Sequence, residues 1–391
     1  MRLVALTDRQ LRAGPGLKWG RARPDVIPAD IAELDFAVAP PIRAVLRDAV
    51  TRSHLGYPDY TAGTPVRLAE LFARRMRAKH GWQPDPGAVE ICAQITQALC
   101  CAVLAYTRAG DQVLVHTPTY PPFLEAIRSL GRRPVLLPVA NHGDARAAES
   151  WAAVERERRI RLIVLCQPHN PTGHVFDTAT LEVIARLAVR RDAVIFSDEI
   201  HAEIVYEGAD CPSIASVPDA AERSVVFTSA AKTFNIAGLR CAVGHFGSAA
   251  LHDLFRAMPW HLRSGAGALG VTATITAWES CDEWLDQLRA RLSVNRTIVS
   301  DFLSHVGRVR FLPPAATYLA WIDLRDVRAL PDVHTLLLNE GKISLQPGTV
   351  FGPSLEGFVR LNFGTSGRRL RVILERFYDA LETCNRKGPE E

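Results

Sequence analysis

Three side chains of different chemistry come just after three apolar segments of this 391-residue chain. Asn170 follows "RLIVLC", Asp198 follows "AVIF" and Lys232 follows "SVVF". Such uniformly apolar runs are typical of parallel strands that helices cover on both faces. In open parallel sheets, ligands bind in the crevice beyond the carboxyl ends of the strands. We therefore expect an amide, a carboxylate and an amine to converge at one edge of a sheet.

Each of these residues also has a purely structural interpretation. The segment "NPTG", which begins with Asn170, is a favourable turn sequence. Asp198 could cap the helix after its strand, His201 could be a structural histidine, and an isolated lysine is usually solvated. Lys232, however, is one of only five lysines among 46 basic residues. Four such residues at the ends of strands in one crevice favour a functional site.

A lysine and a carboxylate together indicate a particular cofactor. A lysine amine can form a Schiff base with an aldehyde, and a carboxylate can hold a protonated pyridine nitrogen. Pyridoxal 5'-phosphate carries both groups, so the sequence predicts a site for it. Ser229 and Arg240 could bind its phosphate, together with the first amides of a helix that begins within "AQITQAL" (93–99). Tyr120, just after another strand, could cover the ring.

Several motifs resemble those of a known family. The segments "QPHNPTG", "SDEIH", "SAAKTFNIAGLR" and "GFVRLNFG" resemble the class I/II aminotransferase family, the fold-type I pyridoxal phosphate enzymes. Within it, "AELDFAVAPPI", "GYPDY" and "TPTYPPF" are similar to the MalY/PatB-type cystathionine β-lyases, or C–S lyases. The resemblance extends from about residue 17 to 380, nearly the whole chain.

The resemblance implies a role for each matching residue around the cofactor ring. Lys232 would bind the cofactor aldehyde and later move the α-proton of the substrate. Asp198 would pair with the pyridine nitrogen and keep it protonated. Asn170 and His201 would lie near the phenolic oxygen, and Tyr120 would stack on the ring.

The resemblance also assigns residues to the phosphate and to the substrate. Those that would hold the phosphate are Thr96, Gln97, Ala98, Ser229 and Arg240. Tyr57 would reach the phosphate in the neighbouring subunit, which implies a homodimer with shared active sites. Arg360 would bind the substrate carboxylate through its planar, bidentate guanidinium. No metal is implied.

Three positions depart from the pattern of the lyases. Ala231 stands where the residue before the lysine is usually serine, so a hydrogen bond is missing or is supplied by Thr228. The segment "PADIAELDF" lacks the usual aromatic residue, and Ser366 and Gly367 replace a Pro-Arg pair. These changes bear on the substrate more than on the cofactor.

The cofactor motifs are compatible with more than one function. The first hypothesis is α,β-elimination of L-cystathionine or a related cysteine S-conjugate to pyruvate, ammonia and a thiol. The second is a class I/II aminotransferase, because both reactions use the same residues. The third is a regulatory protein that uses the cofactor fold to sense a ligand, although such proteins usually carry an additional DNA-binding domain.

The elements that must position these residues suggest an α/β protein. Seven strand candidates alternate with helix-length segments, which predicts a doubly wound, mostly parallel sheet. We expect a large cofactor-binding domain at 50–285, a smaller α+β domain at 286–391, and an N-terminal arm at 1–49 that packs on the smaller domain. The candidate strands are 89–95, 111–118, 133–139, 161–168, 193–199, 224–230 and 241–247. A long helix (281–306) would link the domains, a small mixed sheet would follow, and a final helix would close the chain.

Composition excludes several classes of protein. The net charge of +4 is small and dispersed, unlike the basic stripe of a nucleic-acid-binding protein. None of the eight cysteines forms a C-x-x-C motif, and a long chain with thiols in apolar runs suits the reducing cytoplasm. No window approaches 18 apolar residues, and the first apolar run is too short for a signal peptide.

Overall fold

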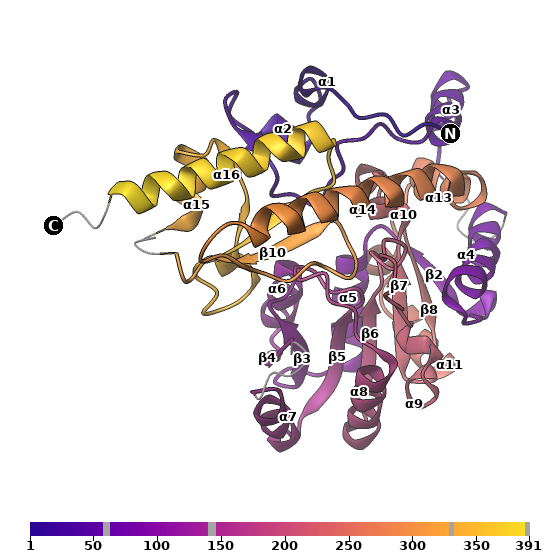
Figure 1. Cartoon of the computed structure of the whole chain (residues 1–391). Helices are drawn as coiled ribbons and strands as arrows, with labels where there is room; N and C mark the ends of the chain where they lie inside the picture. Colours follow the sequence, from indigo (N-terminus) through magenta and orange to yellow (C-terminus); the bar gives the residue numbers. More distant parts are fainter. Residues whose placement is uncertain (58–62, 140–145, 328–331, 388–391) are drawn as a thin grey trace.

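A computed structural model describes residues 1–57, 63–139, 146–327 and 332–387. Figure 1 shows a large sheet with helices packed around it and a smaller group of strands and helices at one end. The long helices α14 (Asp282–Ser304) and α16 (Gly367–Lys387) lie against each other in this smaller group. None of the helices in the described ranges is both long enough and apolar enough to cross a membrane.

The large sheet contains the seven strands that the sequence predicts. Their spatial order is β2-β8-β7-β6-β5-β3-β4, and only β8 runs antiparallel to its neighbours. All five residues of β7 are buried, as are six of the seven in β5, because helices cover both faces. The bounds are β2 (Val89–Cys92), β3 (Gln112–Thr117), β4 (Arg133–Pro138), β5 (Ile160–Cys166), β6 (Val194–Asp198), β7 (Ser224–Thr228) and β8 (Ala242–Phe246).

Local sequence signals account for where several helices begin and end. Asp177 caps α8 by accepting a 2.8 Å hydrogen bond from the Thr180 amide, and Asp192 ends the helix in the left-handed conformation. The helices around the large sheet are α4 (Thr64–His80), α5 (Ile95–Tyr106), α6 (Pro121–Ser129), α7 (Arg146–Arg156), α8 (Thr178–Arg191), α9 (Pro218–Ala221), α10 (Ala230–Thr233), α11 (Ala249–Arg256), α12 (Trp260–Arg263) and α13 (Ala268–Ser280).

The smaller domain differs from the single mixed sheet that we expected. It has a four-stranded antiparallel sheet, in the order β12-β13-β10-β9, and a separate parallel pair, β1 and β11. The buried Leu345 divides "GKISLQPG" into β11 and β12, so one segment contributes to both sheets. The bounds are β1 (Ile27–Pro28), β9 (Arg310–Phe311), β10 (Leu319–Asp323), β11 (Ile343–Ser344), β12 (Gln346–Pro347) and β13 (Phe358–Asn362), with helix α15 at Val333–Asn339.

The N-terminal arm contacts both parts of the molecule. Helices α1 (Asp8–Arg12) and α2 (Leu17–Gly20) precede β1, which pairs with β11 of the smaller domain. Helix α3 (Pro40–Thr51) instead packs against α13. The domain limits at 49/50 and 285/286 stay a prediction, and α3 and α14 each run across one of them.

Candidate active site

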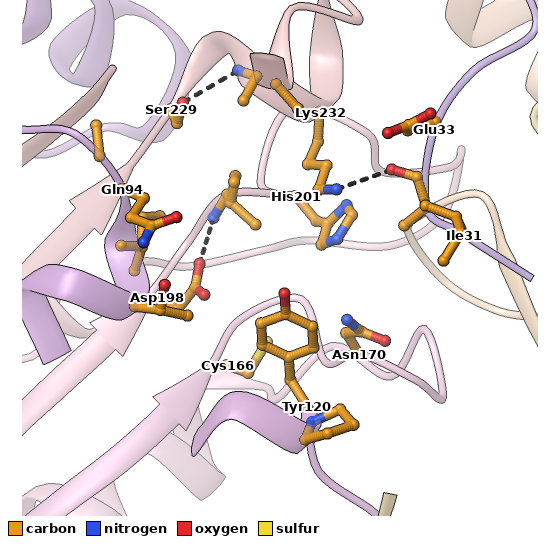
Figure 2. Close-up of a pocket in the computed structure, with 18 of the residues that line it drawn as sticks. Ile31, Glu33, Gln94, Tyr120, Cys166, Asn170, Asp198, His201, Ser229 and Lys232 are labelled. Atoms are coloured by element: carbon orange, nitrogen blue, oxygen red, sulfur yellow. Dashed lines mark hydrogen bonds between the residues drawn. The ribbon is translucent and has the colours of Figure 1, made fainter. Parts of the chain in front are cut away.

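The register of the large sheet brings the three predicted strand ends together. Cys166 at the end of β5 lies opposite Asp198, and Asp198 lies opposite Phe227 of β7. The segments after these strands therefore emerge side by side. They surround a cavity of about 550 Å³ that is lined by Asn170, Asp198 and Lys232, among others. Figure 2 shows these side chains around this cavity, so the predicted convergence is confirmed.

Lys232 projects into the cavity from the short helix α10. Its Nζ donates a 2.8 Å hydrogen bond to the carbonyl oxygen of Ala32 in the N-terminal arm. Burial lowers the pKa of the Lys232 amine to about 8, and the positive charge of Arg360 acts in the same direction. The negative charges of Glu33 and Asp198 partly oppose this shift. The amine is therefore much easier to deprotonate than an exposed lysine.

Asp198 is the last residue of β6 and is almost completely buried. Its Oδ1 accepts a 3.1 Å hydrogen bond from the amide of Ile200. Burial raises the pKa of the Asp198 carboxyl to about 7, while the Ile200 amide and the charge of Lys232 act to lower it. A buried carboxyl with so raised a pKa lacks a full counter-charge, so it would be stabilised by a cation in the cavity.

Arg360 extends from β13 of the smaller domain to the same cavity. Its Nη1 donates to Asn170 Oδ1 at 2.9 Å, and its Nη2 donates to the Asp30 carbonyl at 2.5 Å. Its Nε is buried and has no partner among the described residues. Burial lowers the pKa of Arg360 to about 10, so the guanidinium stays charged at neutral pH. The site thus contains a fixed cation with a free donor.

His201 and Tyr120 complete the wall near Asp198. His201 is buried, and its Nδ1 has no hydrogen-bond partner in the described part of the chain. Burial, with the charges of Lys232 and Arg360, lowers the pKa of His201 to about 3, so the imidazole is neutral. Tyr120 lies at the start of α6 and lines the cavity, and burial raises the pKa of its phenol.

Three of the five residues predicted to bind phosphate line the cavity: Thr96, Ser229 and Arg240. The hydroxyl of Ser229 donates to the Cys241 carbonyl at 2.5 Å and accepts from the Ala231 amide at 3.1 Å. Arg240 adopts a left-handed backbone with φ of 55°, and its guanidinium donates to the side chain of Gln94. One end of the cavity therefore offers a hydroxyl, a cation and the first turn of α5.

The two other predicted phosphate residues do not line the cavity. The Gln97 side chain donates to the carbonyl oxygens of Leu262 and Ser264, at 2.8 and 2.7 Å. The Ala98 amide donates to the Gln94 carbonyl at 3.2 Å, as the first amide bonded within α5. The backbone amides of residues 95–97 come before that of Ala98 and have no acceptor within the helix. These three N–H groups are therefore the ones in α5 that could donate to an anion.

Tyr57 lies outside the cavity of its own chain. Its side chain is fully exposed, at 101% of the reference area. It borders a separate hollow together with Gly238 and Leu239, which come shortly before the cavity residue Arg240. The remaining three residues of "GYPDY" (58–60) lie outside the described residues.

The sequence did not reveal several residues of the site. Ala32 and Glu33 of the arm, Gln94, and Phe351 all line the cavity. The signals for the arm residues were the resemblance of "AELDFAVAPPI" to the lyases and the departure in "PADIAELDF". The Thr228 hydroxyl donates to the Glu199 carbonyl at 3.1 Å, so in this arrangement its one proton does not replace a hydrogen bond donated by the serine that is absent at Ala231.

Comparisons with known proteins agree with the motifs. The model of the family "Aminotransferase class I and II" matches residues 31–377. A cystathionine beta-lyase of Corynebacterium glutamicum is 32% identical, over 93% of this chain and 96% of the relative. The cystathionine beta-lyase PatB of Bacillus subtilis is 31% identical, over 91% of this chain and 93% of the relative.

Solved structures share the whole fold. The crystal structure of OvoB superposes with a TM-score of 0.89 at 29% identity, covering 97% of this chain and 99% of that one. Cystalysin from Treponema denticola, whose structure contains pyridoxal 5'-phosphate, has a TM-score of 0.88 at 24% identity, covering 97% of this chain and 98% of its own. The predicted fold class is confirmed, with the large, mostly parallel sheet and the smaller α+β domain. This chain belongs to the class I and II aminotransferase family.

Proposed function

We propose that this chain is a pyridoxal phosphate-dependent carbon–sulfur β-lyase. It would convert L-cystathionine, or a related cysteine S-conjugate, to pyruvate, ammonia and a thiol. The observation that carries the proposal is one cavity that joins the Lys232 amine, the buried Asp198 carboxyl and the Arg360 guanidinium. The choice of elimination is supported by the relatives named cystathionine beta-lyase, which match this chain over nearly its full length.

The residues of the cavity fit the proposed cofactor. Its aldehyde requires an amine that is neutral near physiological pH, and Lys232 has a pKa of about 8. Its pyridine nitrogen requires a buried carboxylate, and Asp198 provides one without a full counter-charge. Its phosphate requires donors, which Arg240 and the start of α5 supply, while the Ser229 hydroxyl would donate to it by turning away from the Cys241 carbonyl. When bound, the cofactor acts as an electron sink that makes the α-hydrogen of an amino acid acidic.

The chain's own groups would then bind the substrate and move its protons. Arg360 binds the α-carboxylate, with its Nε free and its other nitrogens held by Asn170 and Asp30. Lys232 Nζ takes the α-proton, because its lowered pKa makes the neutral amine available. Asp198 stays ionised beside a cationic ring nitrogen, since that charge lowers the carboxyl pKa again. A neutral His201 adds a hydrogen-bonding group without competing for the proton.

We further propose that the enzyme is a homodimer in which Tyr57 completes the phosphate site of the partner subunit. A fully exposed tyrosine beside the exposed Leu55 forms an apolar surface outside the cavity of its own chain. Analytical ultracentrifugation should give a dimer. Tyr57→Phe should weaken cofactor binding without changing the dimer. The seven cysteines that the structure describes are free thiols, which agrees with the proposed cytoplasmic location.

The test of the reaction is an incubation of the loaded protein with L-cystathionine in the absence of any keto acid. Pyruvate and free thiol should appear in a one-to-one ratio. Lys232→Ala is the matched control, because it retains the rest of the cavity and removes the amine. If no pyruvate forms and amino groups are transferred once a keto acid is added, the chain is an aminotransferase. If neither reaction occurs but amino acids bind, the result favours the sensing role over both reactions tested.

A further inference from the structure

A second hollow lies outside the catalytic cavity, where the N-terminal arm, α14 and the start of α16 meet. Its volume is about 680 Å³. Four arginines line it: Arg2 from the arm, Arg291 from α14, and Arg368 and Arg371 from α16. No described carboxylate lines it. We call this hollow the arginine groove.

None of these four guanidiniums has a hydrogen bond or an ion pair within the described residues. Their neighbour Arg369 is the opposite case. It is buried and donates to Asp8 at 2.9 Å, to the Thr365 hydroxyl at 2.9 Å and to the Leu6 carbonyl at 2.9 Å. Arg369 therefore has a structural role that its four neighbours lack.

Two of the unpaired guanidiniums converge on one point at Gly367. A Cβ atom placed on Gly367 would lie 3.6 Å from Arg291 Nη1 and 3.8 Å from Arg371 Nη1. The two nitrogens are therefore at most about 7.4 Å apart. Both side chains are exposed, so water and counter-ions screen their repulsion, and an anion that binds between them would interact with both charges. Planar guanidiniums bind phosphate oxygens in a bidentate manner, which makes arginine the preferred residue for such anions.

The walls of the arginine groove are held by other contacts. Gln287 of α14 accepts a 2.8 Å hydrogen bond from the Leu3 amide, which fixes the arm on α14. Arg369 fixes the arm on α16 through Leu6 and Asp8. Figure 1 shows the indigo N-terminal segment running past the beginning of α16. The arginines are therefore presented from three mutually anchored elements.

The remaining lining adds donors and an apolar floor. Helix α16 begins at Gly367, and the first amide bonded within it is that of Leu370, which donates to the Ser366 carbonyl. The Arg369 amide donates to the Ser366 hydroxyl at 3.2 Å, so the amides of Gly367 and Arg368 are the ones left without a partner within the helix, at the end where the dipole favours negative charge. Leu3, Ala5 and Val294 line the groove between the charges and could contact the organic part of a ligand.

We propose that the arginine groove binds a phosphorylated small molecule through a diphosphate group. Two guanidinium nitrogens at most about 7.4 Å apart could each bind one of two linked phosphates, whereas a single carboxylate would engage only one of them. The hollow is of the size of a small-molecule site. Binding here does not depend on the catalytic proposal, because none of the four arginines lines the catalytic cavity.

The test is a calorimetric titration of the full-length protein, loaded with pyridoxal phosphate, with inorganic pyrophosphate in the absence of divalent metal. Loading blocks the phosphate end of the catalytic cavity. We expect saturable binding of one pyrophosphate per chain. The double variant Arg291→Gln/Arg371→Gln should bind at least tenfold more weakly. The matched control is Arg74→Gln/Arg77→Gln, which removes the same charge from two exposed arginines of α4.

The outcomes separate a specific site from general attraction of anions. Weaker binding in the groove variant alone supports the proposal. Absence of saturable binding to the unmodified protein overturns it, as does an equal loss in the groove and control variants. Equal affinity in all three proteins also overturns it, because binding would then occur elsewhere. Far-ultraviolet circular dichroism and the absorbance of the bound cofactor should be the same in all three, which shows that the variants are folded.

Discussion

Replacing Arg360 by alanine should raise KM for every substrate that carries an α-carboxylate. Arg360 is 5% exposed, and its Nε has no partner among the described residues. A substrate carboxylate that binds there forms a charge pair shielded from water. Truncation of one partner in such a pair costs about 2–5 kcal/mol. Taking about 3 kcal/mol, and about 1.4 kcal/mol for each tenfold change, KM should rise roughly 100-fold.

Arg360→Lys should separate the effect of charge from that of geometry. Lysine keeps a positive charge but cannot donate to Asn170 Oδ1 and the Asp30 carbonyl while it also binds the substrate in a bidentate manner. Part of the charge-assisted hydrogen bonding to the substrate remains in Arg360→Lys. We expect the binding free energy of the substrate to weaken by roughly 1.5 kcal/mol, which corresponds to a rise of about tenfold in KM.

The assay compares two competitive inhibitors that differ only in the carboxylate. The inhibition constant of L-alanine should be much lower than that of L-alaninamide in the unmodified enzyme. In Arg360→Ala the two constants should become similar, because the group that distinguishes them is gone. The cofactor absorbance and the thermal midpoint serve as controls for the folded site. An unchanged KM, or an inhibitor preference that persists in Arg360→Ala, would refute the assignment of the carboxylate site.

Three further predictions concern proton equilibria and stability. The rate at which cofactor-free protein reacts with pyridoxal phosphate should rise with pH and level off above about 8, where the Lys232 amine is neutral. The charge of Glu33 raises the pKa of Lys232, so Glu33→Gln should move the midpoint of this pH dependence to a lower pH. The Asp198 carboxyl has a pKa of about 7 in the folded protein, against an ordinary value of 3.8. The folded state therefore binds this proton more tightly than the unfolded state does. As a result, the free energy of unfolding falls as pH rises from about 4 to 7. Asp198→Asn should remove this loss, which amounts to roughly 4 kcal/mol, and raise the thermal midpoint of cofactor-free protein at pH 8 while abolishing pyruvate formation. Arg75→Ala should lower the free energy of unfolding by about 3–5 kcal/mol, because Arg75 is buried and donates to Glu203 at 2.5 Å.

Each of these predictions has a clear contrary result. A loading rate that still rises steeply above pH 9 would mean that the amine of Lys232 is not deprotonated easily. A thermal midpoint of Asp198→Asn that follows pH as the unmodified protein does would place the titration in another group. A loss below about 1 kcal/mol for Arg75→Ala, measured by urea unfolding, would mean that water replaces its partners.

The sequence determined the framework of the site. Uniform apolar runs predicted all seven strands of the large sheet, because a strand buried on both faces has to be apolar along its whole length. The position of Lys232, Asp198 and Asn170 just after such runs was sufficient to place them at one sheet edge. Each of these patterns is local in the sequence. The parallel topology brings the carboxyl ends of the strands to the same edge of the sheet, so the residues that follow the strands lie near one another.

The tertiary structure decided which backbone and side-chain groups complete the site. Ala32 and Glu33 come 200 and 199 positions before Lys232 and reach it only because the arm is fixed on the smaller domain through β1 and β11. The start of α5 at Ile95 decided that Thr96 faces the cavity, whereas the Gln97 side chain turns to Leu262. No local pattern encodes such contacts, because they depend on how distant elements pack and on which hydrogen bonds are already satisfied.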